Sequence, residues 1–202
     1  MKRSYLIGCI CTSLVVCVGL VLIGYSIGLK QKTRIVHVNF EYEQPKAEEE
    51  RVHRYSFMDP VISDYIEDLS AELGIDPDLP VAHLLVENPE MNWNAIHHNE
   101  NGTLDLGGFQ LNDKYIYLSF LPAYWDLDID FDPFNPKQNT FLALHHIRYL
   151  NEKLKVQEDA IAAYNCGIGA VMNNQIPEIT KIYTKRVINT YKLLKASEDK
   201  NG

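Results

Sequence analysis

A long uncharged stretch near the N-terminus divides the chain into two regions of different character. Residues 5–29, YLIGCICTSLVVCVGLVLIGYSIGL, contain no charged side chain, and a helix of this length can cross the ~30 Å hydrocarbon layer of a bilayer. A cleaved signal peptide has a shorter apolar region of about 7–15 residues and a small-x-small cleavage site, whereas this stretch leads directly into Lys30. We therefore expect residues 1–29 to form an uncleaved transmembrane signal anchor, with a cleaved signal peptide as the alternative.

The rest of the chain divides again by composition. Residues 30–56 are rich in charge and show little apolar periodicity, which is typical of a linker. Residues 57–196 carry the apolar periodicity of a folded domain, and residues 197–202 form a polar tail. Three of the four cysteines lie in the predicted anchor, so Cys166 has no disulfide partner within the domain. The domain must therefore be stabilised by its own core.

The domain is acidic, which excludes one class of partner. Residues 57–202 contain 22 Asp or Glu and 11 Lys or Arg, for a net charge of −11, although the whole chain has a net charge of −8. A nucleic-acid binder needs clustered Lys and Arg side chains that contact phosphates and release counterions. We therefore expect no nucleic-acid partner.

Helical spacing of apolar residues dominates the domain. Asp59 and Pro60 supply an N-cap and a first-turn proline, and apolar positions then repeat until Gly74. Three later segments have the same spacing: residues 137–150, 160–164 and 179–194. The domain is therefore predicted to be mainly α.

A further helix is expected from the Asp76-Pro77-Asp78 start signal to Glu87. Pro89 disfavours helical geometry at Asn88, so Glu87 should lie at or near the end of that helix. The pattern thus places a carboxyl group at a helix edge.

One segment predicts β-structure instead. Residues 95–112, AIHHNENGTLDLGGFQLN, contain an Asn-Gly turn with short flanking segments, followed by the Gly107-Gly108 bend. We expect a small β-hairpin here, which makes the domain α+β.

A run of alternating aspartates, WDLDIDFD (125–132), suggests calcium ligands. An EF-hand loop that starts at Asp126 needs Gly and Glu where this chain has Phe131 and Lys137. The adjacent histidine pairs of the chain do not form the HExxH pattern of a zinc site. We expect an acidic surface loop and no metal site.

Four local patterns follow one another in a fixed order: HLLVEN (83–88), DLGGFQLN (105–112), AYNCG (163–167) and TKIYTKRVINTY (180–191). The ordered set resembles the soluble lytic transglycosylase family of the lysozyme-like superfamily. In that family a helix-terminal Glu is followed by a Gly-x-x-Gln turn, an Ala-Tyr-Asn-x-Gly segment and a Tyr on the last helix. The resemblance covers about residues 57–195 and implies a lysozyme-like α+β fold. DPFNPKQN (132–139) also resembles the stretch that the family has between the Gln turn and the Ala-Tyr-Asn segment.

The chemistry explains why a carboxyl group is needed. Cleavage of a glycosidic bond requires a proton on the leaving oxygen, and apolar neighbours raise the pKa of a carboxyl group so that it still carries that proton near neutral pH. Glu87 follows Leu84, Leu85 and Val86. The resemblance implies that Glu87 acts as general acid and then as base in cleaving the MurNAc–GlcNAc β-1,4 bond of peptidoglycan. The product would be a 1,6-anhydroMurNAc end, formed without a cofactor.

The same resemblance implies the substrate-binding residues. Gly107 and Gln110 would line the cleft, Tyr164 and Asn165 would contact sugar, and Tyr183 would orient the Glu. The residue patterns alone also allow a simple bend at Gly107, core packing of the two tyrosines and helix capping by Asn165.

Two departures from the family pattern affect the chemistry. Asn88 follows Glu87 where the family usually has Ser, and its side chain offers a replacement hydrogen bond. The run that contains Asp105 resembles the second-carboxylate strand of c-type lysozymes. Two carboxyl groups ~5 Å apart allow water to complete a hydrolysis. A turn Asp bonded to nearby backbone amides is an equally supported interpretation, so the end product of the reaction stays open.

Three functions therefore stay open. The first is a lytic transglycosylase that uses Glu87. The second is a muramidase that uses Glu87 with Asp105, and the third is an inactive glycan-binding or scaffolding module of an envelope complex. The expected partners are peptidoglycan glycan strands, the membrane through residues 1–29 and a protein of an envelope machine. We expect a single-pass protein of the inner (cytoplasmic) membrane whose domain lies on the periplasmic, extracytoplasmic side.

Overall fold

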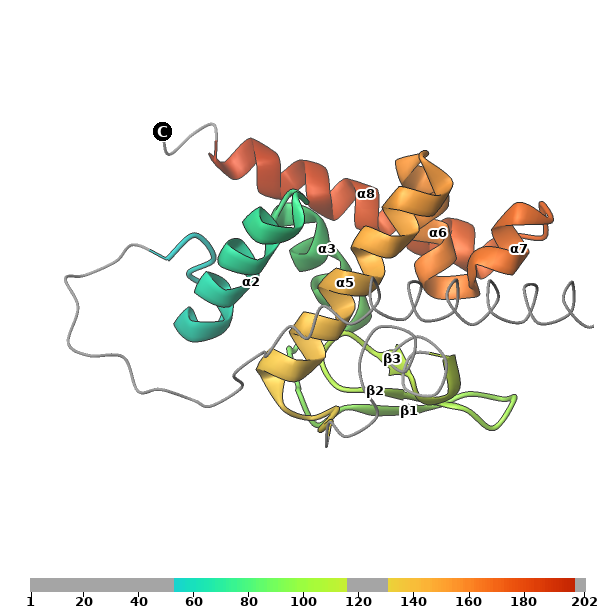
Figure 1. The fold of residues 1–202 in the computed structure, drawn as a ribbon, viewed down its shortest axis with the longest axis horizontal. Coiled ribbons are helices and arrows are strands. Elements are labelled where there is room, and N and C mark those ends of the chain that lie inside the picture. Colours follow the sequence, from blue (N-terminus) through green and yellow to red (C-terminus); the bar gives the residue numbers. More distant parts are fainter. Residues whose placement is uncertain (1–52, 116–130, 199–202) are drawn as a thin grey trace, which may run out of the picture. The chain divides into compact units, whose positions relative to one another are not determined.

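The computed structural model describes residues 53–115 and 131–198, which form α-helices beside a small antiparallel sheet (Figure 1). The predicted anchor, residues 1–29, lies outside these ranges, as does most of the predicted linker. Among the described residues, no helix combines the length and the apolar character that a membrane span requires.

The first two described helices begin and end at the predicted signals. Helix α2 (Pro60–Leu73) is capped by the Asp59 side chain, which accepts hydrogen bonds from the backbone amides of the first turn, and Gly74 ends it with a φ of 67°. A left-handed residue at this position is the ordinary way to end a helix, and glycine adopts it without strain. Helix α3 (Asp78–Glu87) ends where the proline pattern predicts, so the position of Glu87 at a helix end is confirmed.

Helix α3 lies at the centre of the core. Most of its residues are buried, and Leu79, Ala82 and Val86 pack together with side chains of α5, α6 and α8. Each fully buried aliphatic side chain contributes roughly 1.5–3 kcal/mol of transfer free energy. The helix that carries Glu87 is thus held on several sides.

Four further helices lie among the described residues: α5 (Pro136–Leu154), α6 (Gln157–Cys166), α7 (Ile168–Met172) and α8 (Glu178–Glu198). The three helical segments predicted from apolar spacing fall within α5, α6 and α8. Helix α7 was not predicted, because its five residues are too few to show a period.

The β part is larger than the predicted hairpin. Strands β1 (Ile96–His98) and β2 (Leu104–Leu106) form the hairpin, and β3 (Leu111–Asn112) adds to β2 to give a three-stranded antiparallel sheet in the order β1-β2-β3. The expectation of a single hairpin was wrong in this respect, since a strand of two residues has no alternation to detect. The α+β class itself is confirmed.

A buried ion cluster joins the start of α3 to the end of α8. The fully buried Asp78 carboxylate lies 3.1 Å from Arg54 Nη2 and 3.6 Å from Lys195 Nζ, and it accepts a 2.7 Å hydrogen bond from the Tyr55 hydroxyl. Because Asp78 is buried while Arg54 and Lys195 are partly exposed, loss of a basic partner would leave a buried carboxylate less well compensated and would destabilise the fold. The cluster therefore fixes the end of α3 opposite Glu87.

Candidate active site

Glu87 occupies the last turn of α3 and is half-buried. The pKa of Glu87 is raised from its ordinary 4.5 to about 7, chiefly by burial and also by the nearby charge of Asp105. A hydrogen bond with Tyr183 and the charge of Arg186 act in the opposite direction. A carboxyl group with a pKa near 7 is populated in both protonation states at neutral pH, as an acid/base catalyst requires.

Tyr183 of α8 lies near Glu87. Its side chain is buried, its hydroxyl forms a 2.8 Å hydrogen bond with His83 Nδ1, and it lies near enough to Glu87 to lower the pKa of that carboxyl group as a hydrogen-bond partner. Burial and the charge of Glu87 raise the pKa of Tyr183 well above its ordinary range, so the hydroxyl stays protonated. Tyr183 thus lies near the carboxyl group that the family resemblance implies it orients.

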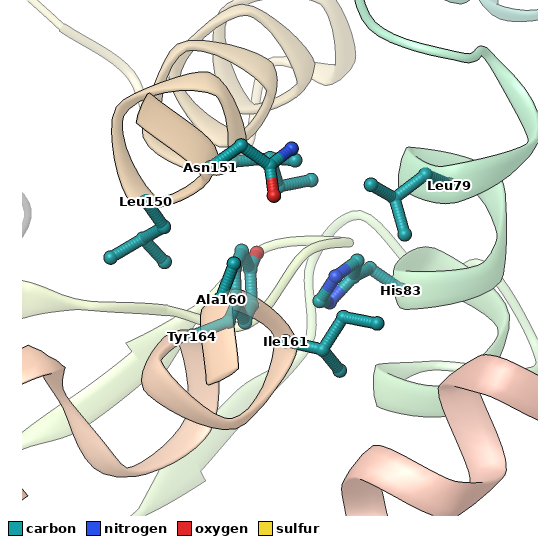
Figure 2. Close-up of a pocket in the computed structure, with 8 residues that line it drawn as sticks. Leu79, His83, Leu150, Asn151, Ala160, Ile161 and Tyr164 are labelled. Carbon is teal, nitrogen blue, oxygen red and sulfur yellow. The ribbon is translucent and has the colours of Figure 1, made fainter. Parts of the chain in front are cut away.

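His83 lies one helical turn before Glu87 and is 1% exposed. Burial lowers the pKa of His83 to about 3, and the ring is therefore neutral. Figure 2 shows the imidazole extending from α3 towards α6, where it meets Ile161 and Tyr164. The His83 and Tyr164 ring centroids are 4.5 Å apart.

The Gly-x-x-Gln turn connects β2 to β3. Gly107 has a φ of 75°, and a Cβ atom there would overlap both the Asn139 side chain and the Pro133 carbonyl oxygen. Gln110 has a φ of 49°, and its Nε2 donates a 2.7 Å hydrogen bond to the Gly107 carbonyl. Gly107 is thus required by the close approach of its neighbours, in addition to its backbone conformation.

Asn139 of α5 holds this turn in place. It is fully buried, and its Oδ1 accepts from the Phe109 amide at 2.9 Å while its Nδ2 donates to the Leu106 and Pro133 carbonyls at 3.1 and 3.0 Å. The sequence analysis missed this role, although the residue lies in the family-like DPFNPKQN stretch. An Asn close behind an N-cap and proline, at a fixed distance after a Gly-x-x-Gln turn, is the signal that could have found it.

Asp105 lies in β2, opposite Asn112 of β3. Asn112 Nδ2 donates a 2.9 Å hydrogen bond to Asp105 Oδ1. The carboxylate is close enough to Glu87 for its charge to raise the pKa of that group. The charge of Asp105 therefore acts on Glu87, the other carboxyl group of the candidate site. Asp105 lies on a strand, and its carboxylate is hydrogen-bonded to the Asn112 side chain.

The two residues of the Ala-Tyr-Asn segment differ in their placement. The Tyr164 hydroxyl donates a 2.9 Å hydrogen bond to the Phe109 carbonyl, so this residue of α6 contacts the Gly-x-x-Gln turn. Asn165 is exposed, and its Oδ1 accepts a 2.7 Å hydrogen bond from the Thr180 hydroxyl. Asn165 therefore joins α6 to α8, while its exposed position leaves it accessible to a ligand.

Asn88 does not take the role suggested for it. Its Nδ2 donates to the Asn92 carbonyl at 2.8 Å and its Oδ1 accepts from the Asn92 amide at 3.2 Å. The side chain is buried and organises the loop after α3. The idea that Asn88 replaces the family's Ser beside Glu87 was therefore wrong, because the Asn92 backbone engages its amide group.

Among residues 53–115 and 131–198, no group of three or more His, Cys, Asp or Glu side chains is arranged to hold a metal ion. Most of the aspartate run considered as a calcium loop lies outside these residues.

Comparisons with known proteins identify a family for this chain. The family described as "Transglycosylase SLT domain" matches residues 65–184, a range that includes Glu87, Asp105, Gln110 and Tyr183. A comparison with curated protein sequences returned no match.

Among solved structures, the X-ray structure of an inactive mutant of the lytic transglycosylase Slt from Pseudomonas aeruginosa is similar, with a TM-score of 0.55 at 14% sequence identity. The alignment covers 67% of this chain and 24% of that one, so the chain spans about a quarter of the length of this relative. A likeness at this identity supports the lysozyme-like fold. The family match extends over more than half of the residues, and the chain belongs to the Transglycosylase SLT domain family.

Proposed function

We propose that this chain is a peptidoglycan lytic transglycosylase in which Glu87 is the general acid and base. The observation that carries the proposal is the half-buried Glu87 at the end of α3, with a pKa that burial raises to about 7 and with the Tyr183 hydroxyl near enough to favour its carboxylate form. This pairing lies within the residues that the Transglycosylase SLT domain family matches.

The reaction divides into two proton transfers. The Glu87 carboxyl group donates its proton to the oxygen between MurNAc and GlcNAc, the bond from the anomeric carbon of MurNAc to that oxygen breaks, and GlcNAc leaves with a 4-hydroxyl. The Glu87 carboxylate then takes the proton of the MurNAc 6-hydroxyl while that oxygen bonds to the anomeric carbon. A 1,6-anhydro ring forms and Glu87 regains its proton.

The environment of Glu87 supports both steps. Burial favours the protonated form that the first step needs, whereas the hydrogen bond with Tyr183 favours the carboxylate that the first step leaves. Because these effects oppose each other, neither form is so stable that it stops the cycle.

The remaining family-implied residues are proposed to bind the glycan. The Gln110 amide uses one N–H on the Gly107 carbonyl and has a second N–H and an oxygen to offer to sugar hydroxyls. Gly107 keeps the turn close to α5, Tyr164 supports the turn through Phe109, and Asn165 presents an exposed amide.

A muramidase is the second candidate. The charge of Asp105 acts on Glu87, and Asn112 orients the Asp105 carboxylate. A carboxylate in this position would stabilise the glycosyl cation long enough for water to reach it. A silent glycan-binding module is the third candidate, and the raised pKa of the half-buried Glu87 favours the two catalytic candidates over it.

We further propose that residues 1–29 anchor the chain in the cytoplasmic membrane, with the domain in the periplasm. The domain carries an excess of acidic residues and many cell walls are anionic, so a protein of an envelope machine would serve to hold it at the wall.

A digest of purified sacculi with the full chain in detergent tests the proposed function. Mass spectrometry separates anhydromuropeptides from muropeptides with reducing ends. Anhydro products that Glu87→Gln abolishes support the transglycosylase, reducing ends indicate the muramidase, and no cleavage at all indicates the binding module.

A further inference from the structure

One hydroxyl group in the core faces two side chains of α3. The Tyr183 hydroxyl forms a 2.8 Å hydrogen bond with His83 Nδ1 and acts on the pKa of Glu87 as a hydrogen-bond partner, and His83 and Glu87 lie one turn apart on α3. A tyrosine hydroxyl has a single proton, so it can donate to only one of these two side chains.

The protonation state of Glu87 determines whether the Tyr183 hydroxyl donates its proton to Glu87 or to His83. An ionised carboxylate only accepts hydrogen bonds, so Tyr183 must donate to Glu87 in that state. The 2.8 Å bond to His83 then requires a proton on Nδ1, with the Tyr183 oxygen as its acceptor.

The surroundings of His83 keep the ring neutral. It faces His146 of α5, Tyr164 of α6 and Tyr183 of α8, while Glu87 is subject to the charges of Asp105 and Arg186. The pKa of His83 is about 3 and that of Glu87 is about 7, so Glu87 titrates while the imidazole stays uncharged. The neutral imidazole of His83 therefore acts on Tyr183 through the position of its single N–H group and adds no charge to the site.

We propose that His83 is a positioning residue: its Nδ1–H donates to the Tyr183 oxygen and so directs the Tyr183 proton to Glu87. This inference rests on the proposed function, because it describes how the acid/base carboxylate is held between the two proton transfers. The dipole of the Tyr183 hydroxyl is thereby fixed before the reaction, at no cost in reorganisation when the charge on Glu87 develops.

Nitrogen NMR of the full chain in detergent micelles tests the tautomer directly. The His83 signals are assigned by their loss in His83→Leu among the seven histidines of the chain. Above pH 7 the proposal predicts a proton on Nδ1 of wild-type His83 and none on Nε2. A proton on Nε2 alone would overturn it.

Enzyme kinetics test whether His83 affects catalysis through Tyr183 and Glu87. His83→Leu should lower kcat about tenfold, equivalent to ~1.4 kcal/mol, with a smaller change in KM. The same variant should raise the pKa of Glu87, because a Tyr183 hydroxyl whose proton is no longer directed to Glu87 stabilises the carboxylate less. The alkaline limb of the pH profile of kcat/KM, which reports this pKa, should therefore move to higher pH. His83→Asn keeps an amide nitrogen at the same bonded distance from Cγ as Nδ1, and should recover part of the rate.

Two controls separate positioning from packing. In a Tyr183→Phe background, His83→Leu should not shift the alkaline limb of the pH profile any further, since the hydrogen bond between His83 and the Tyr183 hydroxyl is already absent. Leu79→Ala removes a buried side chain beside His83 (Figure 2) and should leave the limb in place. Additive shifts in the double variant, or an equal shift in Leu79→Ala, would contradict the proposal. The tautomer measurement needs no turnover, so it stands even if the chain cleaves no peptidoglycan.

Discussion

The buried Asn139 of α5 accepts a 2.9 Å hydrogen bond from the backbone amide of Phe109, thirty positions earlier in the chain. This contact and two bonds from its Nδ2 fasten the Gly-x-x-Gln turn to the helical core. The turn carries two of the residues proposed to bind glycan, so the geometry of the cleft depends on a side chain outside it.

Removal of this amide should destabilise the domain. Asn139→Ala leaves a buried amide and two carbonyl groups without their partner, and each such group costs about 1–3 kcal/mol. We expect the free energy of unfolding in urea to fall by about 3 kcal/mol or more. Arg148→Ala, which removes an exposed ion pair on the same helix, should cost less than about 1 kcal/mol. Similar losses for the two variants would mean that Asn139 does not hold the turn.

Two glycines with similar backbone angles provide a second test. Gly74 and Gly107 have φ values of 67° and 75°, but a Cβ at Gly74 meets nothing within 4 Å, whereas one at Gly107 overlaps Asn139 and Pro133. Gly74→Ala should therefore cost about 1–2 kcal/mol, the strain of a left-handed residue. Gly107→Ala should cost several kcal/mol more in the same thermal or urea unfolding experiment. Equal costs would show that the space around Gly107 is not restrictive.

Glu87 should make the stability of the domain depend on pH. Its folded pKa of about 7 lies above the ordinary 4.5, so the folded state binds the proton more tightly and stability is lost as pH rises through this window. Glu87→Gln removes this effect and leaves all other titrating groups in place. The variant should gain stability relative to wild type between about pH 4.5 and pH 7, by up to about 3 kcal/mol. A difference that stays constant over this range would mean that the pKa is not raised.

Asp105 should determine the product if the chain is a muramidase. Asp105→Asn removes the negative charge and keeps the shape of the side chain. A transglycosylase would lose little activity in a sacculus digest, and loss of that charge would lower the pKa of Glu87 and move the alkaline limb to lower pH. A muramidase would lose activity by about 100-fold or more. Asn112→Ala keeps the Asp105 charge but removes the bond that orients it, together with the Asn112 bonds to Thr103 and to the backbone amides of residues 114 and 115, and should give a smaller effect of the same kind.

Much of the helical framework could be predicted because its signals are local. Asp59, Gly74 and Pro89 lie within a few residues of the helix ends that they specify, and the structure confirms those ends. Strand β3 and helix α7 were missed, since elements of two and five residues are too short to show a period.

The candidate site was predictable only in part. The family-like patterns gave Glu87 and Tyr183, and the structure brings these two together. The bond between His83 and Tyr183 joins positions 100 residues apart, and no local pattern specifies such a contact. Asn88 was misjudged for the same reason, because its partner was assumed from its neighbour in sequence, while its actual bonds go to Asn92.

The central claim is that Glu87 carries out both proton transfers of a transglycosylase reaction. The most direct measurement is the mass spectrum of sacculi digested by the wild-type chain and by Glu87→Gln, with circular dichroism to verify that the variant is folded. The account predicts anhydromuropeptides from wild type and at least a 100-fold loss in the folded variant. Anhydromuropeptides released at the wild-type rate by Glu87→Gln would contradict it.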